Sequence, residues 1–150
     1  MTIKDLSREL CEICGIKPMY RLKDINALYN EDMYNEFCEM RLNKGLLIPT
    51  GTKAIFPDFT PEKQLELIKL IAQDNRGFQA VHFSEWTCES CHDSYNRNYF
   101  LKWAPGATFE EALARLLILL IKNKHLKKKE VKRILEDDWQ RSERSFVEVC

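Results

Sequence analysis

The segment ATFEEALARLLILLIKNK, residues 107–124, constrains the fold more than any other part of the chain. Thr108 and Glu111 occupy capping-box positions, so we expect a helix to begin beside them. Its inner face carries apolar side chains at helical spacing: Ala112, Leu113, Leu116, Leu117 and Leu120. Ile118, Leu119 and Ile121 make the helix apolar nearly all round. Such a helix must be buried on more than one side, so the rest of the chain has to cover it.

Two strands and a second helix are expected to supply that cover. FQAVHFSEW (78–86) and NYFLKWA (98–104) alternate and are rich in aromatic and β-branched residues, which indicates two antiparallel strands. Thr60 and Pro61 give a cap and a first helical residue for a helix over 61–75. We therefore expect an α+β fold, with an antiparallel β-hairpin or small sheet packed against the 61–75 and 109–123 helices. The expected core is Leu65, Ile68, Phe83, Tyr99, Leu101, Leu113, Leu116, Leu117 and Leu120.

Accessory helices are expected at both ends. Ile3, Leu6, Leu10 and Ile13 line one helical face that Gly15 ends. A second helix is expected over Asn30–Asn43 and a last one over about 128–142, while LLIPTGTKAIFPDF between them has the breakers of a long connector. The length of 150 residues, with no repeat or linker, favours a single domain, 1–150.

Charge and hydropathy exclude several classes of protein. Lys and Arg number 23, as do Asp and Glu, so no net charge draws the whole chain to nucleic acid or anionic membrane. The start MTIKDLSREL lacks the apolar core of a signal peptide. The longest apolar run, LLILLI, is far below the roughly 20 residues that span a bilayer. We expect a cytoplasmic protein that does not enter membranes.

Two C-x-x-C pairs raise the question of a metal. Cys11 and Cys14 form CEIC, and Cys88 and Cys91 form CESC, in what we expect to be a loop between the two strands. A two-residue gap allows one tight turn to offer two sulfurs to one zinc, and four thiolates complete a structural site. The sequence therefore offers Cys11, Cys14, Cys88 and Cys91 as ligands, with His92 or Cys38 as substitutes, for one structural zinc or for none.

Other readings of these cysteines stay open. Cys14 falls on the apolar seam of the first helix, as a buried thiol would. CESCH matches the string for c-type haem attachment, but the export signal that attachment needs is missing. A redox pair needs nearby positive charge, and Cys11 and Cys14 lie at the negative end of a helix.

A basic cluster occupies residues 122–133: Lys122, Lys124, Lys127, Lys128, Lys129, Lys132 and Arg133. Such a cluster can neutralise phosphates. Because Glu136 can pair with Lys132 or Arg133 along a helix, a solvated helix junction is the simpler interpretation.

No sequence motif points to catalysis. The chain has no G-x-S-x-G, no glycine-rich phosphate loop and no H-E-x-x-H, so an enzyme is not favoured. Trp and Tyr are favoured anchors of protein interfaces, and the candidates are Trp86, Tyr95, Tyr99, Trp103 and Trp139. These aromatics could equally fill the core.

The order of GIKPMYRL, FPDFTPEKQLELIKLI, two strands and ATFEEALARLLILLIKN resembles small uncharacterised α-β-β-α sandwich proteins encoded by phages and prophages of low-GC bacteria. This resemblance covers about two thirds of the chain and carries no site. It implies an accessory protein in the host cytoplasm. We expect a non-enzymatic protein that binds another macromolecule, with a host protein as the expected partner. The alternative is a zinc-stabilised nucleic-acid-binding module that uses the two C-x-x-C pairs and the 122–133 cluster.

Overall fold

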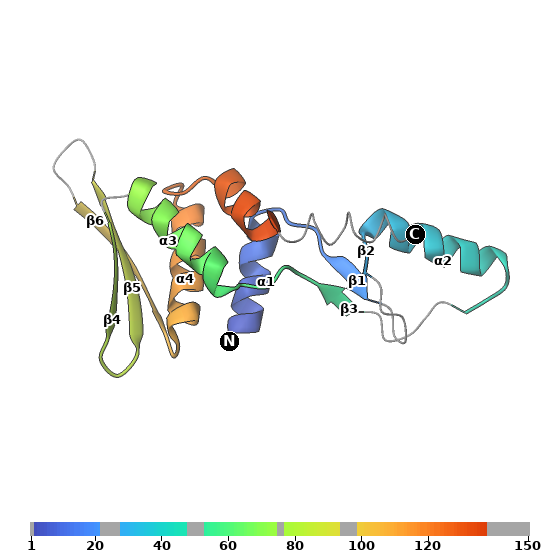
Figure 1. Ribbon diagram of the computed structural model, residues 1–150, viewed down its shortest axis with the longest axis horizontal. Coiled ribbons are helices and arrows are strands. Elements are labelled where there is room, and N and C mark those ends of the chain that lie inside the picture. Colours follow the sequence, from blue (N-terminus) through green and yellow to red (C-terminus); the bar gives the residue numbers. More distant parts are fainter. Residues whose placement is uncertain (1, 22–27, 48–52, 75–76, 94–98, 138–150) are drawn as a thin grey trace. The chain divides into compact units, whose positions relative to one another are not determined.

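A computed structural model describes residues 2–21, 28–47, 53–74, 77–93 and 99–137; within these ranges the side chains of residues 74, 91–93 and 99–101 are not described. The fold is α+β, as expected (Figure 1). Residue contacts divide the chain into two compact units. The first comprises Met1–Gly15 and Asp58–Leu135, and the second contains Ile16–Pro57. The single domain expected from the length stays a prediction.

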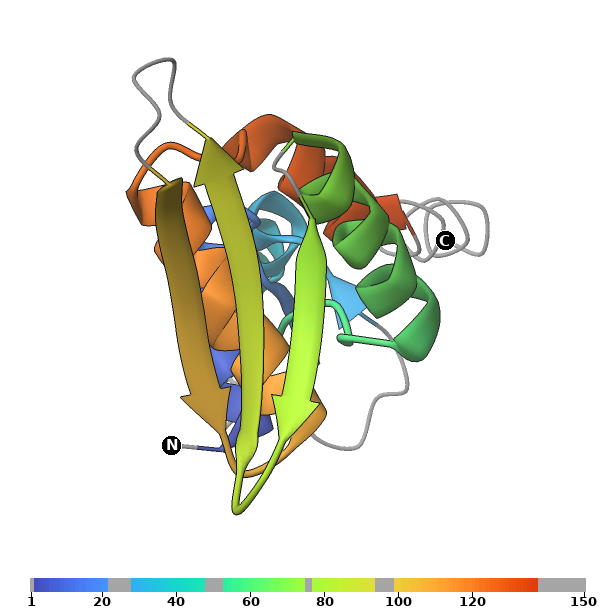
Figure 2. The same ribbon diagram turned by 90° about the vertical axis from the view of Figure 1, so that its left-hand side faces the viewer.

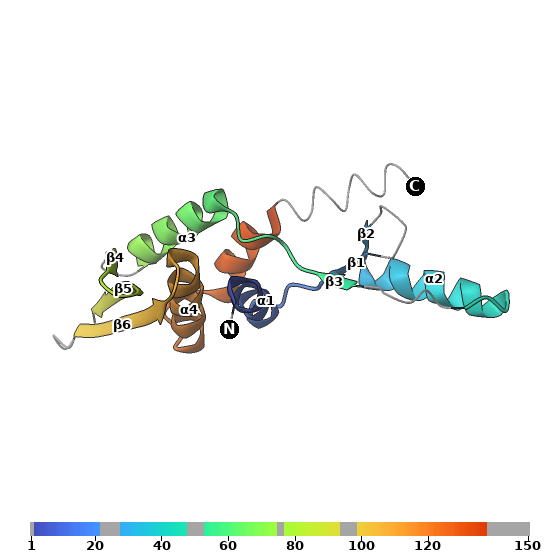
Figure 3. The same cartoon turned by 90° about the horizontal axis from the view of Figure 1, so that it is seen from below.

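The first unit places helices on one face of an antiparallel sheet. The sheet consists of β4 (Phe78–His82), β5 (Trp86–Asp93) and β6 (Tyr99–Gly106), with β5 in the centre. The helices α3 (Pro61–Asp74) and α4 (Phe109–Lys122) lie behind it in Figure 2. Figure 3 shows α4 between the sheet and α1 (Ile3–Ile13). In Figure 2 the opposite face of the sheet is not covered by any described element of this unit.

The helix α4 is the centre of this unit, as its sequence predicts. Leu113, Leu116, Leu117 and Leu120 have no exposed surface, and Ile118 and Ile121 are also buried. The amide of Glu111 donates to the Thr108 hydroxyl at 3.2 Å, which confirms the expected cap. The Glu111 carboxylate, however, accepts from the Ala107 amide at 3.2 Å, one residue before the cap. The cap therefore also fixes the residue that joins β6 to α4.

The expected loop around the second cysteine pair is wrong. Residues Trp86–Asp93 form the central strand β5, so of the expected hairpin or small sheet the structure has the small sheet, with three strands. Cys88 and Ser90 are buried on the face toward α4, because small side chains at alternating positions fit against a helix. Every residue of β5 pairs with a residue of β6, from Trp86 opposite Gly106 to Asp93 opposite Tyr99.

The expected inner face of α3 is also wrong in part. Leu65 is 53% exposed and Ile68 is half-buried, while Leu67, Leu70 and Ile71 face inward. Lys63 and Gln64 are buried with them, and their side-chain nitrogens donate to the carbonyls of Asp58 and Phe59 at 3.1 and 2.8 Å. These bonds satisfy backbone carbonyls in the segment just before the helix. Because Lys63 and Gln64 must turn inward to reach these carbonyls, polar side chains occupy buried positions at the start of α3.

Of the other expected core residues, Phe83 is not in the core, and Tyr99 and Leu101 stay predictions. Phe83 is 86% exposed, because it lies in the turn between β4 and β5 and not in a strand. Tyr99 and Leu101 lie in β6, but their side chains are outside the described part of the structure.

The terminal helices of the first unit bury part of their expected inner faces. In α1, Leu6 and Leu10 are buried, but Ile3 and Ile13 are only half-buried. Cys11 and, just after the helix, Cys14 are buried as well, and Gly15 follows with φ +79°. Residues 128–137 are helical, and Val131 and Leu135 are buried. The rest of the expected helix, including Trp139, lies outside the described residues.

The second unit is built on a small antiparallel sheet in the order β2-β1-β3. Its strands are β1 (Met19–Arg21), β2 (Leu28–Tyr29) and β3 (Lys53–Ile55), and the last of these lies in the expected connector. The expected second helix is α2 (Glu31–Asn43), capped by Asn30. Tyr34 stacks on Tyr20 with ring centroids 4.8 Å apart, and Phe37 stacks on Tyr29 at 5.8 Å. Since α2 has no buried residue, these aromatic pairs are its main attachment.

Gly106 permits the close approach of β6 to the first turn of α4. A Cβ atom at this position would lie 2.9 Å from both the Ala112 Cα and the Thr108 carbonyl oxygen, which are backbone atoms. We expect Gly106→Ala to lower the free energy of unfolding by about 1–3 kcal/mol, measured by urea denaturation. The neighbouring Ala107→Ser is the control, because Ala107 is exposed. Equal stability of Gly106→Ala and the wild type would contradict this close approach.

Asp5 makes the stability of α1 dependent on pH. The Asp5 carboxylate accepts hydrogen bonds from the hydroxyl and from the amide of Thr2. These bonds, with the hydroxyl making the larger contribution, lower the pKa of Asp5 below its ordinary value of 3.8. A lowered pKa means that the carboxylate stabilises the folded state above pH 3.8 and that this contribution disappears as pH falls through the lowered pKa. We expect the stability difference between wild type and Asp5→Asn to shrink below pH 3.8.

A direct measurement of the Asp5 carboxyl by NMR titration checks the cause. In Thr2→Val the hydroxyl is gone, so the Asp5 pKa should rise back toward 3.8. An equal Asp5 pKa in the wild type and in Thr2→Val would show that the Thr2 hydroxyl does not lower this pKa.

Candidate functional site

The uncovered face of the β4-β5-β6 sheet is the candidate functional site. Cys88, Ser90 and Ala104 are buried against the helices, so the residues between them in β5 and β6 face outward. The strand register extends this alternation to β4. We call the outer sheet face the surface formed by Gln79, Val81, Thr87, Glu89, Trp103 and Pro105.

Trp103 and Glu89 form the chemical centre of the outer sheet face. They are direct cross-strand partners in the pairing of β6 with β5. Partners of this kind have Cβ atoms about 4.5–5.5 Å apart, so an indole ring and a carboxylate lie side by side. The side chain of Trp103 is 55% exposed, although its strand β6 is paired with β5 along its whole length. A carboxylate beside an aromatic face is suited to a cation, through ion pairing and cation–π attraction together.

The other aromatic side chains named in the sequence analysis have different surroundings. Trp86 is half-buried, with its ring 5.7 Å from Phe109 in an edge-on contact and 4.9 Å from the ring of His82. It therefore packs the end of the sheet against α4. The side chains of Tyr95, Tyr99 and Trp139 lie outside the described part. Phe83, which was expected in the core, is instead an exposed aromatic at the β4–β5 turn.

Three described side chains on the inner face of the sheet show what chemistry is available there, whereas the side chain of His92 on the same strand is not described. Burial raises the pKa of the Cys88 thiol to about 12, so it stays protonated at neutral pH and is a poor nucleophile. The hydroxyl of Ser90 is buried and has no hydrogen-bond partner among the described residues. His82 is the only histidine in the strands with a described side chain. It is exposed to solvent, and its ring contacts the ring of Trp86. These side chains do not form a nucleophile–base pair.

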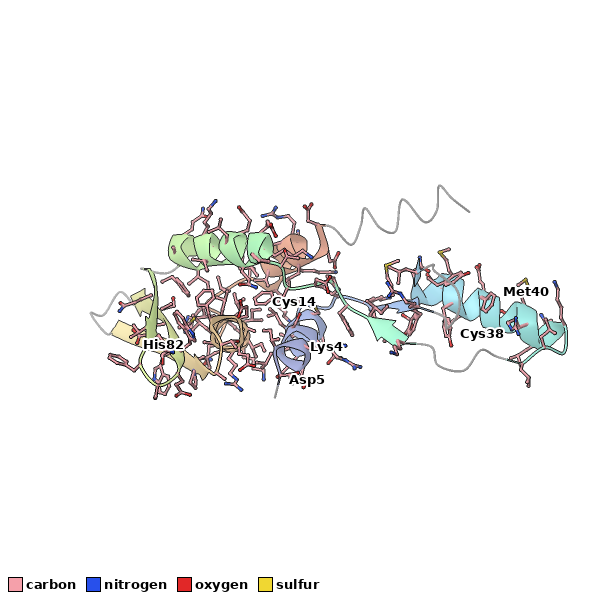
Figure 4. The ribbon with its side chains drawn as sticks, turned by 60° about the horizontal axis from the view of Figure 1, so that its bottom comes forward. Lys4, Asp5, Cys14, Cys38, Met40 and His82 are labelled. Carbon is pink, nitrogen blue, oxygen red and sulfur yellow. The ribbon has the colours of Figure 1, made fainter. Side chains whose placement is uncertain are left out.

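Within the first unit, the structure does not bring Cys88 to the Cys11 and Cys14 pair. Cys11 and Cys14 lie in and just after α1, and Cys88 lies in β5 on the other side of α4. Figure 4 labels Cys14 beside α1 and Cys38 on α2, which belongs to the second unit. Among the described side chains, no three His, Cys, Asp or Glu residues form a group that could hold a metal ion. The side chains of Cys91 and His92 are not described, so the four-cysteine zinc site stays a prediction.

The basic cluster lies at the junction between α4 and the helix over 128–137. Lys122 is in the last turn of α4, 3.8 Å from the Glu9 carboxylate of α1. Lys124 follows the helix with φ +61°, and the His125 amide donates to the Leu120 carbonyl at 2.8 Å. This is a Schellman ending with lysine at the position where glycine is usual. Lys127, Lys128, Lys129 and Arg133 are exposed, and Lys132 is half-buried.

Comparison with known proteins yields no relative: no family model, no curated protein and no solved structure gives a significant match. The resemblance to phage proteins therefore stays a prediction. In the part of the chain that the structure describes, no helix is both long and apolar enough to cross a membrane.

The burial of the thiols predicts their order of reaction with iodoacetamide. Cys11, Cys14 and Cys88 are buried and Cys38 is half-buried. We expect Cys38 to be alkylated first of these four and Cys88 last, because its raised pKa adds to its lack of access. Peptide mapping of the native protein over time gives the order, and labelling in denaturant is the control. Rapid native labelling of Cys88 would contradict its place against α4.

Proposed function

We propose that this chain is a protein-binding module that uses its outer sheet face. The observation that carries the proposal is the 55% exposure of Trp103 directly beside Glu89. An exposed tryptophan in a paired strand does not stabilise the sheet by burial, whereas tryptophan at an interface is among the most effective anchors. The strands hold both side chains on a rigid support, so little entropy is lost when a partner binds.

The partner is a protein that presents an arginine or lysine next to an apolar side chain. On the outer sheet face Glu89 is the charged residue. In the next row of the register Pro105 and Thr87 lie beside the Trp103–Glu89 pair, and Val81 follows on β4, so this part of the face is largely apolar. A guanidinium can stack on Trp103 while it donates to the Glu89 carboxylate, and arginine suits this geometry better than lysine because its group is planar.

The biological setting of the proposal comes from the sequence. The resemblance to phage and prophage proteins supports a non-enzymatic accessory protein that binds a host protein in the host cytoplasm.

Peptide titration followed by NMR tests the proposal. Short peptides that differ only in carrying arginine, lysine or glutamate are added to the 15N-labelled protein, and the Trp103 indole N–H resonance, assigned with Trp103→Phe, is monitored. We expect a saturable shift with arginine, a weaker one with lysine and none with glutamate. Glu89→Gln should weaken arginine binding roughly five- to thirtyfold, as loss of a charged partner worth about 1–2 kcal/mol predicts.

Phe83→Ser is the matched control, because it removes an exposed aromatic outside the outer sheet face. It should leave the arginine titration unchanged. The same shift with arginine and glutamate peptides, or an arginine affinity that Glu89→Gln does not alter, would refute a cation-binding face.

The alternative function, a zinc-stabilised nucleic-acid-binding module, has two separable parts. The metal part needs Cys88 and Cys91 together with the α1 pair, and elemental analysis of protein purified without metal resin measures it directly. The nucleic-acid part depends on the basic cluster alone and does not require the metal.

A further inference from the structure

The strand β6 has one edge with which no described strand pairs, since the order of the sheet is β4-β5-β6. We call it the free edge of β6. The carbonyl of Pro105 is directed to the free edge, because it accepts a hydrogen bond from the Arg115 guanidinium of α4 at 2.7 Å. Proline also lacks the N–H that a ladder bond to Thr87, its register partner in β5, would need. Pro105 therefore lies at a ladder position whose backbone groups point outward.

The position of Pro105 fixes the direction of the backbone groups along β6. In an antiparallel ladder the N–H and C=O of one residue point to the same side, and the side alternates from each residue to the next. The pairing of β6 with β5 runs without interruption from Tyr99 to Gly106, so Trp103 and Leu101 have the same direction as Pro105. Their backbone N–H and C=O groups therefore offer two donors and two acceptors to a strand added at the free edge.

Trp103 brings the free edge and the outer sheet face together. Its indole lies on the outer sheet face, whereas its backbone groups point to the free edge. A strand added to β6 would place one residue directly opposite Trp103 and two strand spacings, about 9–10 Å, from Glu89. A long cationic side chain at that residue can cross the indole and reach the carboxylate. The edge of β4 is less suitable, because β4 and β5 would separate a strand there from Trp103.

We propose that the partner protein adds an extended segment to the free edge of β6, antiparallel like the other pairs of this sheet, with an arginine opposite Trp103. This inference rests on the proposed function of the outer sheet face and names the conformation of the partner. The residue after the arginine would lie opposite Lys102, which shares the inner face with its buried register partner Ser90. A carboxylate there completes the charge match, so the segment that fits carries arginine followed by glutamate or aspartate.

A second copy of this chain is a poorer occupant of the free edge. Lys102 is the one cation in the sequence of β6, and it belongs to the inner face, so a second β6 offers no cation to Glu89. Antiparallel pairing of Trp103 with Leu101 of the second copy would also place the two Lys102 side chains opposite each other, which is unfavourable. The charges along this edge therefore favour a different protein.

Backbone methylation of a peptide tests the added strand. A short peptide with a central Arg-Glu is titrated into the full chain by calorimetry, together with two versions that each carry one N-methyl group. On the second residue after the arginine the N–H faces the Leu101 carbonyl, so a methyl group there should weaken binding roughly tenfold or more. On the third residue the N–H points away from β6, and a methyl group there should leave the affinity unchanged.

The two possible failures are distinct. Equal affinities of the two methylated peptides, with binding still dependent on arginine, would overturn the added strand and leave the proposed function of the outer sheet face intact. Binding that does not depend on arginine would overturn the proposed function, and this inference with it.

Charge reversal at Lys102 tests the register. Lys102→Glu should weaken binding of the Arg-Glu peptide and strengthen binding of an Arg-Lys peptide, each by up to about fivefold, as a cross-strand charge pair predicts. Lys53→Glu, the same reversal at an exposed residue of β3, is the control and should change neither affinity. Equal effects of the two variants would overturn the proposal. Sedimentation equilibrium of the chain alone gives the last arm: a dimer that the peptide dissociates would show that a second copy occupies the free edge, and the proposal would be wrong.

Discussion

The burial of α4 on both sides is the constraint on which the first unit depends. Its leucine and isoleucine side chains are buried, and the helix packs against the sheet on one side and α1 on the other, so neither partner is dispensable. Truncation of one buried leucine typically costs about 2–5 kcal/mol, against a total stability of about 5–15 kcal/mol for a domain. Residues from both ends of the chain are thus brought together because one helix has no polar face to expose.

Local signals in the sequence were sufficient to place the helices. Thr60 with Pro61, Thr108 with Glu111, and Gly15 after the apolar seam each satisfy backbone groups at one helix end, and each lies where it was expected. These signals act within a few residues and so can be read without knowledge of the fold. The inward direction of α3 could not be read in this way. It depends on Lys63 and Gln64 reaching back to carbonyls of the preceding turn, a feature that composition hides.

The central strand was missed because its inward residues are small and polar. Cys88 and Ser90 fit under α4, but in a sequence they resemble the residues of a loop, and the C-x-x-C spacing suggested a metal. Alternation of Trp86, Cys88 and Ser90 with Thr87 and Glu89 was the available signal. Trp103 was named as an aromatic anchor from its residue type, whereas Glu89 was found only through the strand register. A site made by cross-strand pairing is invisible until the middle strand is recognised.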